Sequence, residues 1–190
     1  MSKKITALIP VRKGSKRVKN KNTKPFSDTN LLEHKIRTLQ KVDGLTEILV
    51  TTDCSIALSI AEKMGVSYVL RDGYYASDDC PGSENLQYIA SQTNTDHVLY
   101  SPVTSPFISV ETYNEIIKLY NDNNDFDSIV SINYLKKFLW EDNKPLNYDP
   151  YNCPKSQDLE SIFGLTFGVC LLPRQTMIDK RYVVGDNPHW

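Results

Sequence analysis

The sequence has little from which a metal centre or a disulfide framework could be built. It contains 4 cysteines and 3 histidines in 190 residues. Cys54, Cys80, Cys153 and Cys170 stand far apart and form no C-x-x-C pair, which is typical of free thiols in a reducing compartment. We therefore expect neither a zinc site nor structural disulfides.

Long apolar runs are also missing. The apolar stretch near the N-terminus is interrupted by Pro10 and Arg12 before it reaches the length of a signal-peptide core or a membrane span. We therefore expect a cytoplasmic protein with no membrane partner.

The chain lacks an excess of charge of either sign. Lys and Arg number 22 and Asp and Glu number 23, for a formal net charge of -1. A general nucleic-acid binder would carry a broad positive field, so we expect no nucleic-acid partner. A function that depends on positive charge must therefore rest on a local cluster of cations.

What the sequence does contain is an alternation of short β-branched runs with amphipathic segments. The length and the 40% hydrophobic content suit one globular domain spanning residues 1–190. Alternation of this kind predicts a doubly wound α/β fold, with a mostly parallel sheet and helices on both faces. The expected strands are residues 5–11, 47–52, 67–70, 97–101, 127–133 and 161–172, and the expected helices are 31–39, 56–64 (ending at Gly65) and 109–121.

Residues 134–160 break this pattern and are interpreted as an excursion from the sheet. The segment is rich in Pro, Asn, Asp and Lys, yet it carries Phe138, Trp140, Tyr148 and Tyr151. Aromatic surface of this size marks a partner or a ligand, whereas the alternative is a loop folded back on its own domain. The sequence leaves both interpretations open.

The clearest chemical signal is a cluster of positive charge directly after the first expected strand. Ligands of open α/β sheets bind at the carboxyl ends of the strands, so this loop is where a site is expected. Gly14 and Ser15 add a flexible backbone and a hydroxyl, and N–H groups and cations together suit a triphosphate. Seven cations and no acidic residue occupy the loop: Arg12, Lys13, Lys16, Arg17, Lys19, Lys21 and Lys24.

A basic loop can also be merely solvated or can touch RNA. Its position after a buried strand and before a helix favours phosphate binding, and the amides of Asn20 and Asn22 suit a base or a sugar. The loop is neither a Walker A motif nor a G-x-G-x-x-G motif, which disfavours ATPases and dinucleotide dehydrogenases.

The run from Ile9 to Asn22 resembles the signature of the acylneuraminate cytidylyltransferases, the family that contains CMP-sialic acid synthetases. The likeness extends over nearly the whole chain. Further segments similar to that family are residues 50–53, 69–71, 76–78, 104–107 and 167–169.

This resemblance implies a nucleotidyltransferase that moves CMP from CTP to the anomeric hydroxyl of a nonulosonic or keto-deoxy sugar acid and releases pyrophosphate. It implies a Mg²⁺ cofactor and a homodimer formed through residues 134–160. Arg12 and Lys21 would be catalytic. The residues that would bind the nucleotide are Arg12, Gly14, Ser15, Lys21, Asn22, Arg71, Gly82 and Ser83, with Asn22 and Arg71 at the cytosine.

Two of the implied roles have local alternatives. Arg71 can instead form a surface ion pair with Asp72. Asp53 can bind ribose or metal, or it can cap a helix that begins near Ser55.

The chain departs from the family pattern in its acceptor residues. Residues 101–106 lack the usual Gln, and residues 164–168 replace the usual Arg and Asn-Gly. The identity of the sugar acid is therefore open, and spacing does not single out one cation for its carboxylate among Lys136, Lys137, Lys155 and Arg174.

The metal ligands cannot be identified in the sequence. The family's Ile-Asp-Ile-Asp strand, whose aspartates hold magnesium, has no counterpart before Trp190. Either the chain is a truncated product or other residues hold the metal. Asp179 and Asp186 are substitute candidates. Alternative functions are another sugar nucleotidyltransferase, such as CMP-Kdo synthetase, or nucleotide binding without catalysis.

Overall fold

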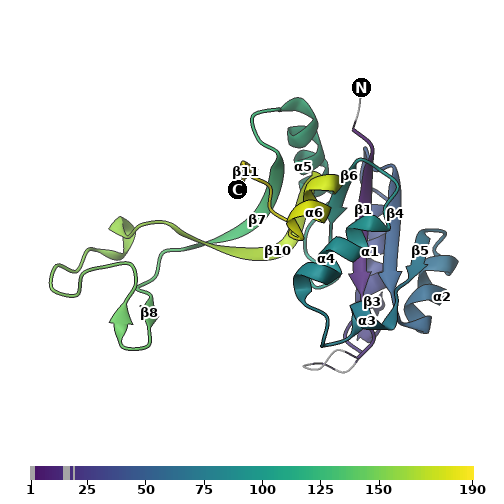
Figure 1. Cartoon of the computed structure of the whole chain (residues 1–190), viewed down its shortest axis with the longest axis horizontal. Helices are drawn as coiled ribbons and strands as arrows, with labels where there is room; N and C mark the ends of the chain where they lie inside the picture. Colours follow the sequence, from purple (N-terminus) through teal and green to yellow (C-terminus); the bar gives the residue numbers. More distant parts are fainter. Residues whose placement is uncertain (1–2, 15–17, 19) are drawn as a thin grey trace. The chain divides into compact units, whose positions relative to one another are not determined.

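Four parallel strands form the centre of the structure. In the computed structural model, which describes residues 3–14, 18 and 20–190, these are β1 (Ile5–Val11), β4 (Glu47–Thr52), β5 (Ser67–Leu70) and β6 (His97–Tyr100). β1 lies between β4 and β6, and β5 pairs with the outer edge of β4 (Figure 1). Their carboxyl ends therefore meet at one edge of the sheet.

Three further strands complete a seven-stranded sheet of order β11-β7-β10-β6-β1-β4-β5. β10 (Ile162–Pro173) is antiparallel to β6, and β11 (Pro188–His189) is parallel to β7 (Ser128–Leu135). The predicted α/β fold with a mostly parallel sheet is confirmed, and the six predicted strands occur within two residues of their expected bounds.

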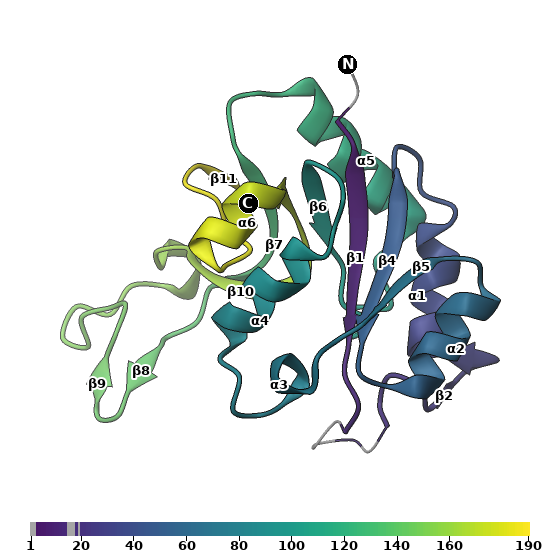
Figure 2. The ribbon, with the colours of Figure 1, turned by 45° about the vertical axis from the view of Figure 1, so that its right-hand side comes forward.

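Helices cover both faces of the sheet. The odd-numbered residues of β1, from Ile5 to Val11, share one buried apolar cluster with residues of α1 (Leu31–Leu39), α2 (Ser55–Lys63) and α5 (Val110–Asp122). α4 (Gly82–Ser91) contacts β1, and it packs against α6 (Arg174–Lys180). Figure 2 shows α4 and α5 on opposite faces. Because both faces of β1 are covered, its sequence is apolar at nearly every position.

The start of α5 and the end of α2 form where the sequence predicts them. Ser109 caps α5 by accepting a hydrogen bond from the Thr112 N–H at 3.2 Å. Gly65 follows α2 with φ of 68°, a left-handed conformation that glycine adopts without strain. The sequence reasoning missed α3 (Gly73–Ala76), α4 and α6. α4 begins after Pro81 and has no side-chain cap, so it carries no start signal of the usual kind.

Residues 131–166 form a second compact unit, separate from the unit made of the remaining chain. Within it, β8 (Trp140–Glu141) and β9 (Lys144–Pro145) form a short hairpin, and η1 (Ser156–Asp158) is a single 3-10 turn. In the first unit, β2 (Pro25–Phe26) and β3 (Thr29–Asn30) form another hairpin. Over the described part of the chain, no helix has the length and apolarity needed to cross a membrane.

Candidate functional site

Arg71 joins the carboxyl ends of three parallel strands. It directly follows β5, and its Nη2 donates to the carbonyl of Thr51 in β4 at 2.7 Å and to the carbonyl of Val11 in β1 at 3.2 Å. Its Nη1 donates to Asn85 Oδ1 of α4 at 3.2 Å. The side chain thus fixes the strand ends and the start of α4 around one buried cation.

The surface ion pair of Arg71 with Asp72 is the wrong interpretation. Arg71 is only 4% exposed, and the Asp72 carboxylate accepts from the Tyr74 N–H at 2.8 Å instead. Burial lowers the pKa of Arg71, and the nearby Asp53 carboxylate opposes this effect. Its Nε is buried and has no hydrogen-bond partner among the described residues. A buried donor of this kind is costly, so a bound acceptor would complete its bonding.

The basic loop after β1 is anchored at both ends. The Lys13 N–H donates to Asp53 Oδ1 at 2.7 Å, which ties the loop to the end of β4. Asn22 Nδ2 donates to the Arg12 carbonyl at 3.2 Å and closes the loop on itself. Gly14 has φ of 77°, a conformation that a side chain would strain. These contacts hold the two ends of the loop at the carboxyl ends of β1 and β4.

Asp53 does not cap α2, which corrects one of its two predicted roles. The N-cap of α2 is Cys54, without a side-chain hydrogen bond, because the Asp53 carboxylate accepts from Lys13 instead. Asn22 is likewise occupied in closing the loop, and its predicted contact with cytosine stays a prediction.

Arg12 reaches from the basic loop to the segment between α3 and α4. Its Nη2 lies 2.9 Å from Asp78 Oδ1, with side chains 37% and 53% exposed. An exposed ion pair of this kind contributes at most about 1 kcal/mol and exchanges easily for a stronger anion. Lys21 is half-buried at the other end of the loop. The predicted site residue Ser15 lies outside the described residues, as do Lys16, Arg17 and Lys19.

Gly82 and Ser83 begin α4 and line a cavity of about 370 Å³ together with Asn85, Tyr100 and Tyr182. A Cβ built on Gly82 would meet nothing within 4 Å, so the helix start is open. α4 has no side-chain cap, so the first N–H groups of the helix, at Gly82 and Ser83, have no side-chain acceptor at this cavity. Burial raises the pKa of Tyr100 to about 12, so its phenol stays protonated at neutral pH.

The described residues do not gather a set of three His, Cys, Asp or Glu side chains that could hold a metal. Asp179 accepts from Gln175 Nε2 at 2.8 Å, and Asp186 pairs with Lys180. Among the residues that the structure describes, neither Asp179 nor Asp186 therefore belongs to a cluster of metal ligands. Two of the four cations considered for the acceptor are also engaged: Arg174 donates to the carbonyls of Ala90 and Ser91 at the end of α4, and Lys136 to that of Gln157.

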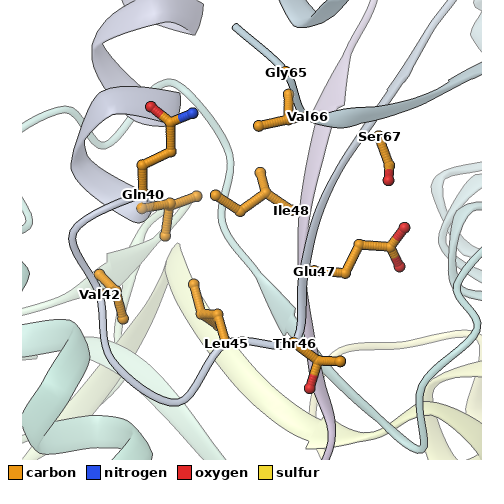
Figure 3. Close-up of a pocket in the computed structure, with 10 residues that line it drawn as sticks. Gln40, Val42, Leu45, Thr46, Glu47, Ile48, Gly65, Val66 and Ser67 are labelled. Carbon is orange, nitrogen blue, oxygen red and sulfur yellow. The ribbon is translucent and has the colours of Figure 1, made fainter.

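Another cavity, of about 390 Å³, lies at the opposite edge of the sheet (Figure 3). Glu47 and Ser67, the first residues of β4 and β5, line it beside Leu45 and Ile48. The Glu47 carboxylate accepts from the buried Thr6 hydroxyl at 3.2 Å. This cavity is at the amino ends of the strands, away from the edge where open α/β sheets bind ligands.

Solved structures with the same arrangement define the class of this fold. CMP:2-keto-3-deoxy-manno-octonic acid synthetase, solved in complex with CTP, superposes with a TM-score of 0.68 over 90% of this chain and 75% of that chain, at 16% identity. A cytidylyltransferase from Leptospira borgpetersenii gives a TM-score of 0.62 over 94% of this chain and 63% of that one, at 18% identity. The fold is that of the α/β nucleotidyltransferases.

Residues 6–152 match the cytidylyltransferase family, and the chain belongs to it. The N-acylneuraminate cytidylyltransferase of Escherichia coli is 32% identical over 133 residues, which cover 70% of this chain and 32% of the relative. The CMP-N,N'-diacetyllegionaminic acid synthase of Legionella pneumophila is 31% identical over 62% of this chain and 53% of its own length. The chain thus spans a third to a half of these relatives. The resemblance to acylneuraminate cytidylyltransferases is confirmed.

Sequence reasoning missed two residues that line the site and one buried lysine in α1. Asn85 and Tyr100 lie in segments that carry no motif. Lys35 gave a usable signal, because it stands among Leu32, Ile36 and Leu39 on the apolar face of α1, where a charge is out of place.

Proposed function

We propose that this chain is a cytidylyltransferase that transfers CMP from CTP to the anomeric hydroxyl of a sugar acid. The observation that carries the proposal is that Asp53 and Asn22 bind the ends of the basic loop at the edge of the sheet where the buried guanidinium of Arg71 joins the carbonyls of Val11 and Thr51. This arrangement combines cations for the phosphates with a fixed donor for a base. It lies at the sheet edge where α/β proteins bind nucleotides.

The triphosphate would bind along the basic loop. Arg12 and Lys21 supply charge at its two ends, and the backbone around Gly14 supplies N–H donors. A triphosphate would displace Asp78 from Arg12, because it offers several oxygens to the same guanidinium. Ser15 belongs to this proposal on the resemblance alone.

Cytosine would bind between Arg71 and the start of α4. The unpartnered Nε of Arg71 and the open N–H groups at Gly82 and Ser83 are donors, which suit the carbonyl and ring-nitrogen acceptors of the base. These donors suit cytosine, and they do not by themselves distinguish it from other bases.

In the transfer, the acceptor oxygen forms a bond to the α-phosphorus while the bond to the bridging oxygen of the β-phosphate breaks. Pyrophosphate leaves with that electron pair, and the hydroxyl proton passes to solvent. Arg12 and Lys21 would stabilise the charge that gathers on the leaving group. Mg²⁺ is proposed from the family likeness alone, and no step is assigned to it.

Two classes of acceptor are represented among the relatives. One is acylated, as in N-acylneuraminate and N,N'-diacetyllegionaminic acid. The other is 3-deoxy-manno-octulosonate, the substrate in the name of a relative from Elusimicrobium minutum that is 26% identical over 63% of this chain. Activity as a CMP-Kdo synthetase is therefore the second candidate.

We further propose that the second unit builds a homodimer. Its exposed apolar side chains include Trp140 at 54%, Leu146 at 55% and Tyr151 at 97%. A symmetric contact between two copies would cover this surface. Sedimentation at micromolar concentration should give a dimer that Trp140→Ser weakens, and a wild-type monomer would contradict the proposal.

The test of the function is pyrophosphate release by the chain with each nucleoside triphosphate, Mg²⁺ and both classes of sugar acid. Release that depends on CTP and on a sugar acid supports the proposal. Binding of CTP without release under any condition would favour a nucleotide-binding protein without catalysis.

A further inference from the structure

The cavity drawn in Figure 3 has no role in the function proposed so far. It lies at the amino ends of β4 and β5, whereas Arg71 and the anchored ends of the basic loop lie at the carboxyl ends of the sheet. Its volume of about 390 Å³ is within the range of small-molecule sites. We call it the amino-end cavity. A ligand bound there would occupy a second site, distinct from that of the nucleotide.

The amino-end cavity results from a stagger between two neighbouring strands. β5 begins at Ser67, which pairs with Leu49, so Glu47 and Ile48 of β4 extend beyond the start of β5. The segments that follow α1 and α2 border the space that β5 leaves open. Glu47 is held by the pairing of β4 with β1, in which it lies opposite Thr6. A wall fixed in this way needs little ordering when a ligand binds.

The two sides of the amino-end cavity differ in polarity. Figure 3 shows the side chains of Glu47 and Ser67 on one side, and those of Gln40 and Val42 on the other. The apolar members of the lining are Leu39, Val42, Leu45, Ile48 and Val66. A ligand that fills the cavity therefore needs a polar group at one end and an apolar part over the rest of its length.

The polar side favours a positive charge. The half-buried Glu47 carboxylate accepts from the Thr6 hydroxyl at 3.2 Å, and no described Lys, Arg or His forms an ion pair with it. Two helices end beside the cavity, α1 at its C-cap Gln40 and α2 at its C-cap Met64, next to the lining residue Gly65. Helix C-termini carry partial negative charge, and the carboxylate has unused acceptor capacity. Both features attract a cation and repel an anion.

The basic side chains near these helix ends do not supply that cation. Lys41 follows the C-cap of α1, and Lys63 is the last residue of α2. Both are exposed, and neither lines the amino-end cavity. A positive charge at Glu47 must therefore come from a ligand.

We propose that the amino-end cavity binds an aliphatic amine, with the ammonium group at the Glu47 carboxylate and the hydrocarbon chain over Ile48 and Leu45. An ammonium group has three donors, which suit the carboxylate, the Ser67 hydroxyl and water. The chain removes apolar side chains of the lining from water. This inference does not rest on the proposed function, because neither the basic loop nor Arg71 lines this cavity.

The experiment is calorimetric titration of the chain at neutral pH with hexylamine, 1-hexanol and ethylamine. 1-Hexanol keeps the hydrocarbon chain without the charge, and ethylamine keeps the charge with a much shorter chain. Hexylamine should bind at one molecule per chain, at least about tenfold more tightly than either. A hydrogen bond to a charged group and the burial of four methylene groups each contribute more than the free energy of a tenfold change.

A pair of variants locates the binding site. Glu47→Gln removes the charge and keeps an acceptor oxygen for the Thr6 hydroxyl. It should weaken the binding of hexylamine at least about tenfold and leave that of 1-hexanol unchanged. Glu62→Gln removes an exposed carboxylate of α2 that does not line the cavity, and it should change neither. The comparison of the three ligands on the wild type tests the inference even if Glu47→Gln does not fold.

The opposite results are equally definite. Absence of hexylamine binding, or a dissociation constant equal to that of 1-hexanol or of ethylamine, would overturn the inference, as would binding that survives Glu47→Gln. Displacement of hexylamine by CTP would place the amine at the nucleotide site, which also overturns it. Pyrophosphate release enters none of these measurements, so failure of the cytidylyltransferase proposal leaves this inference standing.

Discussion

The ammonium nitrogen of Lys35 lies 2.7 Å from the hydroxyl oxygen of Tyr113, and both side chains are fully buried. The Tyr113 hydroxyl in turn lies 2.6 Å from Ser101 Oγ, at the end of β6. The network therefore joins α1, α5 and the loop that follows β6. Burial lowers the pKa of Lys35 to about 8.

Lys35 should make stability rise with pH above about 8. The unfolded chain keeps this proton up to about pH 10.5, so between these values the unfolded state binds more protons and the free energy of unfolding increases with pH. Below pH 8, the buried charge of Lys35 lowers the free energy of unfolding by about 3 kcal/mol, at 1.36 kcal/mol for each unit by which its pKa is lowered. Urea unfolding of the wild type and of Lys35→Met, each at pH 7.5 and at pH 9.5, isolates the contribution of Lys35 to the pH dependence of stability. Wild type should gain about 2 kcal/mol relative to the variant, and a parallel pH dependence of the two would refute the assignment.

Lys21→Ala should lower kcat/KM for CTP by about two orders of magnitude, because it removes a cation proposed to stabilise the leaving pyrophosphate. The melting temperature should stay within about 2 °C, since the Lys21 N–H keeps its bond to the Val18 carbonyl. Lys41→Ala removes an exposed lysine beyond the end of α1 and serves as the matched control. Equal losses in both variants would point to a general effect of charge.

Arg71→Met should destabilise the fold by about 3 kcal/mol in addition to weakening CTP binding. It leaves the carbonyls of Val11 and Thr51 buried without their donor. Asn85→Ala removes a single bond to the same guanidinium and should cost about 1 kcal/mol. Urea unfolding measures both, and a loss below 1 kcal/mol for Arg71→Met would mean that this cation does not organise the strand ends.

Asp78→Asn should tighten CTP binding by about two- to fivefold, because the exposed pair with Arg12 no longer competes with the triphosphate. Stability should change by less than about 1 kcal/mol. Asp79→Asn removes the same charge from the neighbouring exposed position and should have the smaller effect on the dissociation constant. Tighter binding of equal size in both variants would attribute it to long-range charge.

The sheet was predictable because β1, β4, β5 and β6 are short apolar runs, with helical periodicity between β1 and β4 and between β4 and β5. The basic loop was also predictable, because its cluster of cations follows directly after a strand that the sequence predicts. The structural role of Arg71, which joins the ends of three strands, was not predictable. Its partners are the main-chain carbonyl of Val11 and the side-chain amide of Asn85, and neither group gives a signal in the sequence. The start of α4 was missed because Pro81 and Gly82 gave no capping signal.

Calorimetric titration of the chain with CTP and with UTP tests the central claim most directly, because the two nucleotides share the triphosphate and the ribose. The basic loop alone would bind both equally. If Arg71 and the start of α4 read cytosine, CTP should bind at least about tenfold more tightly than UTP, and Arg71→Met should abolish the difference. Equal dissociation constants for CTP and UTP in the wild type would contradict the assignment of this site to cytidine.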